Sequence, residues 1–169
     1  MRIATFILAA IALAMFPVSI ERLMTFSHPV LLWDDAEKLV KGHSDLPGAY
    51  RIYYNRGTEL VKVDKPDQAI ADLKQAIALS RDFAEGYGNM GAAYFKKGDW
   101  QNAVASFSKA IEIADSAGKT SSTRYIYGRA MAYEKMGEVE KAQADYKVSC
   151  QQDNRTCNKS KPVPRAILP

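Results

Sequence analysis

The stretch from Tyr50 to Ala117 carries one 34-residue pattern twice, and this duplication decides the fold. The two copies read YRIYYNRGTELVKVDKPDQAIADLKQAIALSRDF, residues 50–83, and AEGYGNMGAAYFKKGDWQNAVASFSKAIEIADSA, residues 84–117. Identical residues recur in register at Tyr53 and Tyr87, Asn55 and Asn89, Gly57 and Gly91, Ala69 and Ala103, and Ala76-Ile77 and Ala110-Ile111. Self-similarity at a fixed period of this length is the signature of a repeat protein.

A third copy follows after a five-residue insertion within DSAGKTSS. It reads TRYIYGRAMAYEKMGEVEKAQADYKVSCQQDNRT, residues 123–156. The matching positions are held by Ile126, Ala130, Tyr133, Gly137, Ala142 and Tyr146. About three such units are the usual minimum for a stable stack, because one unit cannot bury its apolar face alone.

Each copy is predicted to form two antiparallel helices. In the second copy, Tyr87, Met90 and Tyr94 recur at helical spacing and give the first helix an apolar face. Phe107, between two alanines, gives the second helix a small-large-small face. Gly91 is then expected where the two helices approach most closely, and its counterparts Gly57 and Ala130 are small for the same reason.

The turn between the two helices of a copy also has a pattern. Gly98 and Gly137 are expected to end their helices in the left-handed conformation. Asp99 is expected to cap the helix that follows. In the first copy Asp64 replaces the glycine, and Pro66 suits the first turn of a helix.

These residues resemble the tetratricopeptide repeat, whose pattern is aromatic-x-x-L-G-x-x-Y followed by Gly, Ala, aromatic and Ala. The resemblance implies an all-α fold, a right-handed superhelical solenoid of antiparallel helix pairs, over residues 50–157, with repeats at 50–83, 84–117 and 123–156. The second copy matches this pattern nearly throughout and lacks only the proline that closes the repeat in the family, where Asp115 stands. The other copies depart from the pattern at Leu60, Asp64, Ala130 and Ser149, and mildly at Arg56 and Arg129, which replace the usual Leu.

The resemblance also implies a function, which is binding a partner protein or peptide on the concave surface. In the family this surface is lined by outward positions of each first helix. The corresponding residues here are Arg51, Tyr54, Asn55, Thr58 and Lys62, then Glu85, Asn89, Ala92, Phe95 and Lys96, then Arg124, Tyr127, Met131, Glu134 and Lys135. As a set, the aromatic residues Tyr54, Phe95 and Tyr127 are the expected binding anchors.

One well-known mode in the family grips a C-terminal carboxylate with two Lys, two Asn and an Arg. Asn89 occupies an expected place and Arg124 is a basic substitute. Tyr54, Thr58 and Gly128 stand at the other three places. We therefore do not expect this mode here.

Residues 1–20, MRIATFILAAIALAMFPVSI, have the layout of a secretory signal, with Arg2 ahead of an apolar run. The uncharged stretch 3–20 is also just long enough to span a bilayer if it is not cut. The sequence leaves a cleaved signal and a retained anchor equally open. Either one predicts a repeat domain outside the cytoplasm, in the periplasm or tethered to the inner membrane.

Residues 21–49 are expected to be a linker with a short helix, Trp33 to Gly42, that covers the first repeat. Asp34 or Asp35 is expected to cap it, with Leu39 and Val40 facing inward. The tail, residues 158–169 (NKSKPVPRAILP), is basic and contains three prolines, so an irregular structure is expected.

The two cysteines, Cys150 and Cys157, lie close together in CQQDNRTC. In an exported chain they are expected to form a disulfide that ties the end of the last helix to the following turn. A metal site is not expected, because no histidine or further cysteine is near them.

Nothing in the chain predicts catalysis or a cofactor. The only histidines, His28 and His43, lie outside the repeats and lack the neighbours that nucleophilic catalysis requires. The net charge of +4 comes from interleaved acidic and basic residues, so a nucleic-acid surface is not expected. The expectation is a protein-binding adaptor of a bacterial envelope; an enzyme subunit and a cytosolic chaperone-type adaptor are the alternatives.

Overall fold

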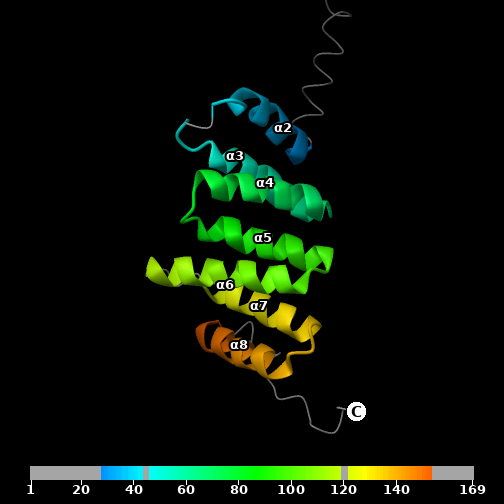
Figure 1. Ribbon diagram of the computed structural model, residues 1–169, viewed down its shortest axis with the longest axis vertical. Helices are drawn as coiled ribbons and strands as arrows, with labels where there is room; N and C mark the ends of the chain where they lie inside the picture. Colours follow the sequence, from blue (N-terminus) through cyan, green and yellow to red (C-terminus); the bar gives the residue numbers. More distant parts are fainter. Residues whose placement is uncertain (1–27, 44–45, 119–121, 154–169) are drawn as a thin grey trace, which may run out of the picture.

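The computed structural model describes residues 28–43, 46–118 and 122–153, and within these ranges it contains helices and no strand (Figure 1). The helices are α2 (Pro29–Val40), α3 (Tyr50–Lys62), α4 (Pro66–Leu79), α5 (Ala84–Lys97), α6 (Trp100–Ser116), α7 (Thr123–Lys135) and α8 (Val139–Gln152). The expected all-α solenoid is confirmed.

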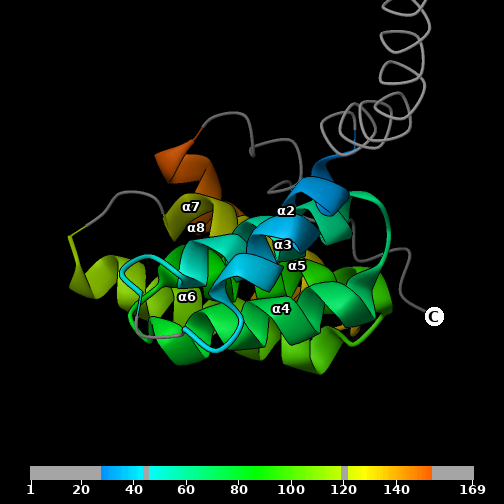
Figure 2. The ribbon, with the colours of Figure 1, turned by 90° about the horizontal axis from the view of Figure 1, so that it is seen from above.

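The helices stack in chain order, with α2 at one end and α8 at the other (Figure 1). Each helix packs against the next, and α3 also contacts α5, which in turn contacts α7. Seen from above, α4 and α6 run along one edge of the stack (Figure 2). The first helices of the three pairs therefore share a face, and this face is where a groove can form.

Small residues allow the two helices of each pair to approach, as expected. A Cβ atom at Gly57 would lie 2.9 Å from Leu73, and one at Gly91 would lie 2.8 Å from the ring of Phe107. Ala130, the counterpart in the third pair, is fully buried. The close approach brings large apolar side chains of the second helices directly against the backbone of the first.

The turns between paired helices also follow the prediction. Gly98 and Gly137 end α5 and α7 with φ of 84° and 76°. Asp64, which takes the place of glycine in the first repeat, adopts the same left-handed conformation with φ of 59°. The carboxylate of Asp99 accepts a hydrogen bond of 3.2 Å from the backbone N–H of Asn102 and so caps α6.

Two arginines that replace an apolar repeat residue each have an aspartate partner on the paired helix. Arg56 on α3 donates to Asp72 on α4 through Nε (2.7 Å) and Nη2 (2.8 Å). Arg129 on α7 donates to Asp145 on α8 in the same way, at 2.7 and 2.9 Å. Both aspartates are buried. The replacements are therefore not mild: each adds a two-pronged ion pair between helices.

Each arginine also reaches the element before its own repeat. Arg129 donates to Ser108 on α6 at 3.1 Å. Arg56 donates to Asp34 on α2 at 3.0 Å, which ties α2 to the first pair. The middle repeat has no such pair, because Met90 and Ser106 stand at the corresponding positions.

The structure corrects the prediction for the helix ahead of the repeats. This helix begins at Pro29, so neither Asp34 nor Asp35 caps it. Leu39 faces solvent with 79% of its surface exposed, and Val30 packs against the core of the first repeat instead. The apolar face of α2 is thus formed by residues nearer its start than expected.

The expected signal or anchor, residues 1–20, and the tail, residues 158–169, lie outside the described residues. Among the helices in the described ranges, none is both long and apolar enough to cross a membrane.

Candidate functional site

A cavity of about 350 Å³ opens on the face shared by the first helices of the three pairs. We call it the groove cavity. It lies among α3, α5, α6 and α7, and its lining comprises Val61, Gly88, Asn89, Ala92, Phe95, Lys96, Phe107, Arg124, Tyr125, Gly128 and Met131. The lining is mostly apolar, with polar side chains at Asn89, Lys96 and Arg124. Pockets of this kind, apolar with a few placed polar groups, are typical binding sites.

Two glycines shape the groove cavity. Gly88 lies against the ring of Tyr125 so closely that a Cβ atom there would collide with it. A Cβ atom at Gly128 would lie 2.7 Å from the ring of Phe107. The adjoining repeats carry tyrosine, Tyr54 and Tyr127, at the position of Gly88. Without a side chain at Gly88 and Gly128, the rings of Tyr125 and Phe107 pack against the backbone there and form the floor of the groove cavity.

The floor of the groove cavity is formed by two buried rings. Phe107 and Tyr125 are both buried, with 6% and 2% of their surfaces exposed. Arg124 lies over the ring of Tyr125, with its guanidinium carbon 4.7 Å from the centroid, and donates to the phenol oxygen at 2.7 Å. Burial raises the pKa of Tyr125, and the bond from Arg124 opposes this rise. The phenol is therefore neutral near pH 7 and accepts from a guanidinium that is itself exposed.

Polar contacts define one side of the site. Asn89 on α5 donates to Thr58 on α3 at 2.8 Å, and Thr58 donates to the backbone carbonyl of Tyr54 at 2.7 Å. The ammonium of Lys96 lies 3.5 Å from the carboxylate of Asp64, and the two side chains are 39% and 81% exposed. Such an exposed pair contributes little energy, so the ammonium of Lys96 is accessible to an anionic group of a ligand.

The structure brings some of the predicted site residues together and directs others elsewhere. Five of the twelve line the groove cavity, namely Asn89, Phe95, Lys96, Arg124 and Met131. Of the three further positions taken from the resemblance, Ala92 lines it as well, and Glu134 and Lys135 do not. Thr58 bonds to Asn89 beside the cavity. The remaining residues, Arg51, Tyr54, Asn55, Lys62, Glu85 and Tyr127, are not in its lining.

All three expected aromatic anchors pack against other rings, and two of them do not line the groove cavity. The ring centroid of Tyr54 lies 4.8 Å from that of Phe83, edge to face. The ring centroid of Tyr127 lies 5.5 Å from that of Tyr146, with the two rings tilted by 59°. Only Phe95 reaches the groove cavity, and its ring also contacts Trp100 at 5.0 Å. Tyr54 and Tyr127 therefore have a role in packing that the repeat pattern alone did not reveal.

The floor residues were missed by the sequence reasoning. The repeat pattern predicts Phe107 only as a core residue of its own repeat, and it predicts no role for Tyr125. The signal was nevertheless present, since Gly88 replaces the tyrosine of the first and third repeats and Gly128 replaces the asparagine of the first and second repeats. Paired losses of side chains at neighbouring repeat positions indicate a cavity.

Other candidate chemistry is sparse. Within the part of the chain that the structure describes, no group of three or more His, Cys, Asp or Glu residues is arranged to hold a metal ion. Cys150 is half-buried on α8, and Cys157 lies outside the described residues, so their pairing stays a prediction.

Comparison with known proteins identifies the repeats. Models of the tetratricopeptide repeat match residues 84–116 and 123–153, and a TPR repeat model matches residues 64–98. The Hsp70-Hsp90 organizing protein of Triticum aestivum is 31% identical over 67 residues, which is 40% of this chain and 12% of that protein. The TPR repeat-containing thioredoxin TDX of Arabidopsis thaliana is 35% identical over 74 residues, 43% of this chain and 20% of the relative. The chain thus spans a fifth or less of these relatives.

Solved structures show the same fold. A crystal structure of MamA superposes with a TM-score of 0.65 at 23% identity, covering 76% of this chain and 74% of that one. The N-terminal domain of stress-induced protein-1 from C. elegans superposes with a TM-score of 0.61 at 19% identity, covering 66% and 91%. With three repeat matches and this shared architecture, the chain is a tetratricopeptide repeat protein with three repeats.

Proposed function

We propose that this protein is an adaptor that binds a segment of a partner protein in the groove cavity between α3, α5 and α7. The observation that carries the proposal is the cavity itself, with an aromatic floor and accessible cations on its rim at Lys96 and Arg124. One relative is named as an organizing protein for two chaperones, which is also a protein-binding role.

The chemistry of the groove cavity defines the partner segment. An apolar side chain fits between Ala92 and the rings of Phe107 and Tyr125, where it replaces water over an apolar floor. An acidic residue next to it pairs with Arg124 or Lys96. The partner segment therefore carries an apolar residue flanked by a carboxylate.

Peptide display against the immobilised chain tests this proposal. Enriched peptides are then measured against Ala92→Phe, which fills the cavity, and Ala105→Phe, which places the same ring on an exposed position of α6. We expect Ala92→Phe to weaken binding at least about tenfold, a loss of about 1.4 kcal/mol, and Ala105→Phe to leave it unchanged. Peptides that bind both variants equally would place the site elsewhere.

We further propose that the adaptor acts in the bacterial envelope, either exported or tethered through residues 3–20. The support is the apolar run behind Arg2 in the sequence. We expect protease added to spheroplasts to digest a tag placed at the C-terminus. A tag that is protected until the cells are lysed would contradict it, and the N-terminal mass of the purified chain distinguishes a cleaved signal from an anchor.

A further inference from the structure

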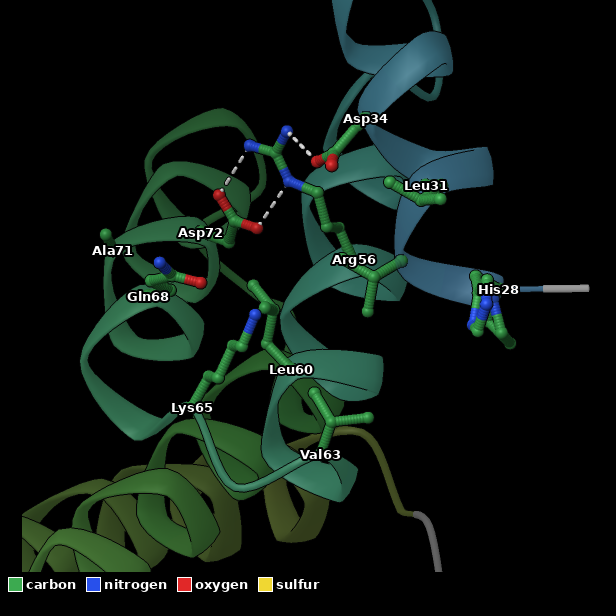
Figure 3. Close-up of a pocket in the computed structure, with 12 residues that line it drawn as sticks. His28, Leu31, Asp34, Arg56, Leu60, Val63, Lys65, Gln68, Ala71 and Asp72 are labelled. Atoms are coloured by element: carbon green, nitrogen blue, oxygen red, sulfur yellow. Dashed lines mark hydrogen bonds and ion pairs between the residues drawn. The ribbon is translucent and has the colours of Figure 1, made fainter. Parts of the chain in front are cut away.

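A second cleft lies at the N-terminal end of the stack, where α2, α3 and α4 meet (Figure 3). We call it the end cleft. Its volume is about 700 Å³, twice that of the groove cavity. Its lining includes apolar side chains from all three helices, among them Val30, Leu31, Leu60 and Ala71.

The end cleft is open because of one departure from the repeat pattern. Leu60 stands where the second and third repeats carry Tyr94 and Tyr133. Tyr94 packs against the apolar clusters on both sides of it, so its ring fills the space between α5 and the preceding helix. Leucine is too short to do this between α3 and α2. The side chains of Leu31 and Val63, which line the end cleft beside it, are 43% and 53% exposed.

One end of the cleft carries excess negative charge. The guanidinium of Arg56 is shared by three carboxylates: Asp72 in two bonds, Asp34 at 3.0 Å and Glu37 at 3.6 Å. The side chain of Asp34 is 41% exposed and directed toward this end of the cleft (Figure 3). Lys65, which is exposed, lies at the opposite edge. A ligand therefore needs an apolar part and, beside it, a cation that reaches Asp34.

We propose that the end cleft of one copy of this chain binds the tail, residues 158–169, of a second copy. The tail reads NKSKPVPRAILP and has three cationic side chains and no acidic one. Arg165 is followed directly by Ala-Ile-Leu, so a cation stands next to apolar side chains as the cleft requires. The prolines at 162 and 164 restrict the free tail, which lowers the entropy lost on binding.

A second copy is a better source for this tail than the same chain. The end cleft and α8 lie at opposite ends of the stack (Figure 1). Successive packed helices are about 8–10 Å apart, so residues 154–164, which span at most about 40 Å, would have to run almost straight along the molecule. Ordering each of these residues costs about 1–2 kcal/mol. A second copy placed end to end avoids this cost and makes a head-to-tail contact that repeats from one copy to the next.

Site-specific photo-crosslinking in the full chain tests the proposal. A benzophenone amino acid is placed at Val63, on the rim of the end cleft, and chains labelled with ¹⁵N are mixed with unlabelled chains. We expect crosslinked peptides that join position 63 to residues 158–169, with heavy–light pairs among them. Arg165→Glu should lower their yield about tenfold or more, and Lys147→Glu, the same reversal on an exposed residue of α8, should leave it unchanged.

Blocking the cleft from the other side completes the test. Leu60→Tyr restores the ring of the other repeats and Ala71→Trp covers the opening, so each should abolish the heavy–light crosslinks. Ala92→Phe in the groove cavity should have no effect, which separates this proposal from the proposed function. Crosslinks only within one copy, crosslinks to residues 1–27, absence of crosslinks, or a yield unaffected by Arg165→Glu would each overturn the proposal.

Discussion

Arg129 and Asp145 hold the last two helices together through two parallel hydrogen bonds, from Nε to Oδ2 at 2.7 Å and from Nη2 to Oδ1 at 2.9 Å. Arg56 and Asp72 repeat the arrangement in the first pair. The middle pair carries Met90 and Ser106 instead. Two different residue pairs thus occupy the same position in the repeats, so the contribution of the ion pair can be tested by replacing it with the pair of the middle repeat.

Arg129→Met should destabilise the chain by about 2–3 kcal/mol, because it leaves the buried carboxylate of Asp145 without its cation. Adding Asp145→Ser installs the combination of the middle repeat and should recover more than half of the loss. Urea unfolding of the two variants measures both values. A double variant that is less stable than Arg129→Met alone would show that the pair has no such coupling.

Asp64→Gly should raise the free energy of unfolding by about 0.5–1 kcal/mol. Asp64 has a left-handed φ of 59°, a conformation that costs a residue with a side chain about 1–2 kcal/mol and costs glycine little. The exposed ion pair with Lys96 that is lost offsets only a small part of the gain. Asp64→Ala is the matched control and should not stabilise. Equal stability of the two variants would mean that the turn strain is negligible.

Asp99→Ala should cost about 1 kcal/mol, since it removes the cap of α6. Hydrogen bonds from the side chain and the backbone N–H of Asn102 lower the pKa of Asp99 in the folded state. The stabilisation is therefore complete above the unfolded pKa of about 3.9 and is lost as the pH falls through the lower folded value. Asp99→Asn still caps the helix, so its stability relative to the parent should improve as the solution is acidified below about pH 4.

Gly91→Leu should lower the midpoint of thermal unfolding clearly and broaden the transition. A Cβ atom alone would lie 2.8 Å from Phe107, so α5 and α6 must separate, at a cost of about 1–3 kcal/mol or more. Each repeat depends on its neighbours, so the loss should spread along the stack. Circular dichroism against temperature measures this. The control is Ala105→Leu, which adds a leucine on the exposed face of α6. Gly118→Leu would not serve as a control, because the left-handed φ of 65° at Gly118 would itself strain a leucine.

Tyr54→Ala and Tyr127→Ala should each reduce stability by about 1–2 kcal/mol, because their rings pack edge to face against Phe83 and at a tilt against Tyr146. Arg124→Ala should instead weaken binding of groove peptides and leave stability within about 0.5 kcal/mol. Unfolding and binding are measured on the same preparations. If the two tyrosine variants lost peptide binding without losing stability, these rings would belong to the binding surface rather than to the packing of the repeats.

The repeat period was sufficient to predict the helices and their turns, because Gly57, Gly91 and Asp99 act through local sterics and hydrogen bonds. It could not predict the partner of Arg56, since the match to Asp72 depends on how two helices are rotated about their axes. The floor of the groove cavity could not be predicted for a related reason: Phe107 belongs to the second helix of its pair, and it lines the cavity only because Gly128 has no side chain, as Tyr125 does beside Gly88. Departures from the repeat, rather than agreement with it, mark both clefts.

The ring of Phe107 also fixes the order of the repeats. It lies against Gly91 of its own repeat and Gly128 of the next one. The residue 34 positions earlier is Leu73, and the repeat that follows it has Asn89 where the third has Gly128. A tandem duplication of residues 84–117 would therefore bring the phenylalanine ring of the first copy against the asparagine of the second, and an exchange of the second and third repeats would separate Phe107 from Gly128. Repeats that look interchangeable by their period have become specific to their place in the chain, so this gene can gain or lose a unit only with a compensating change at that contact.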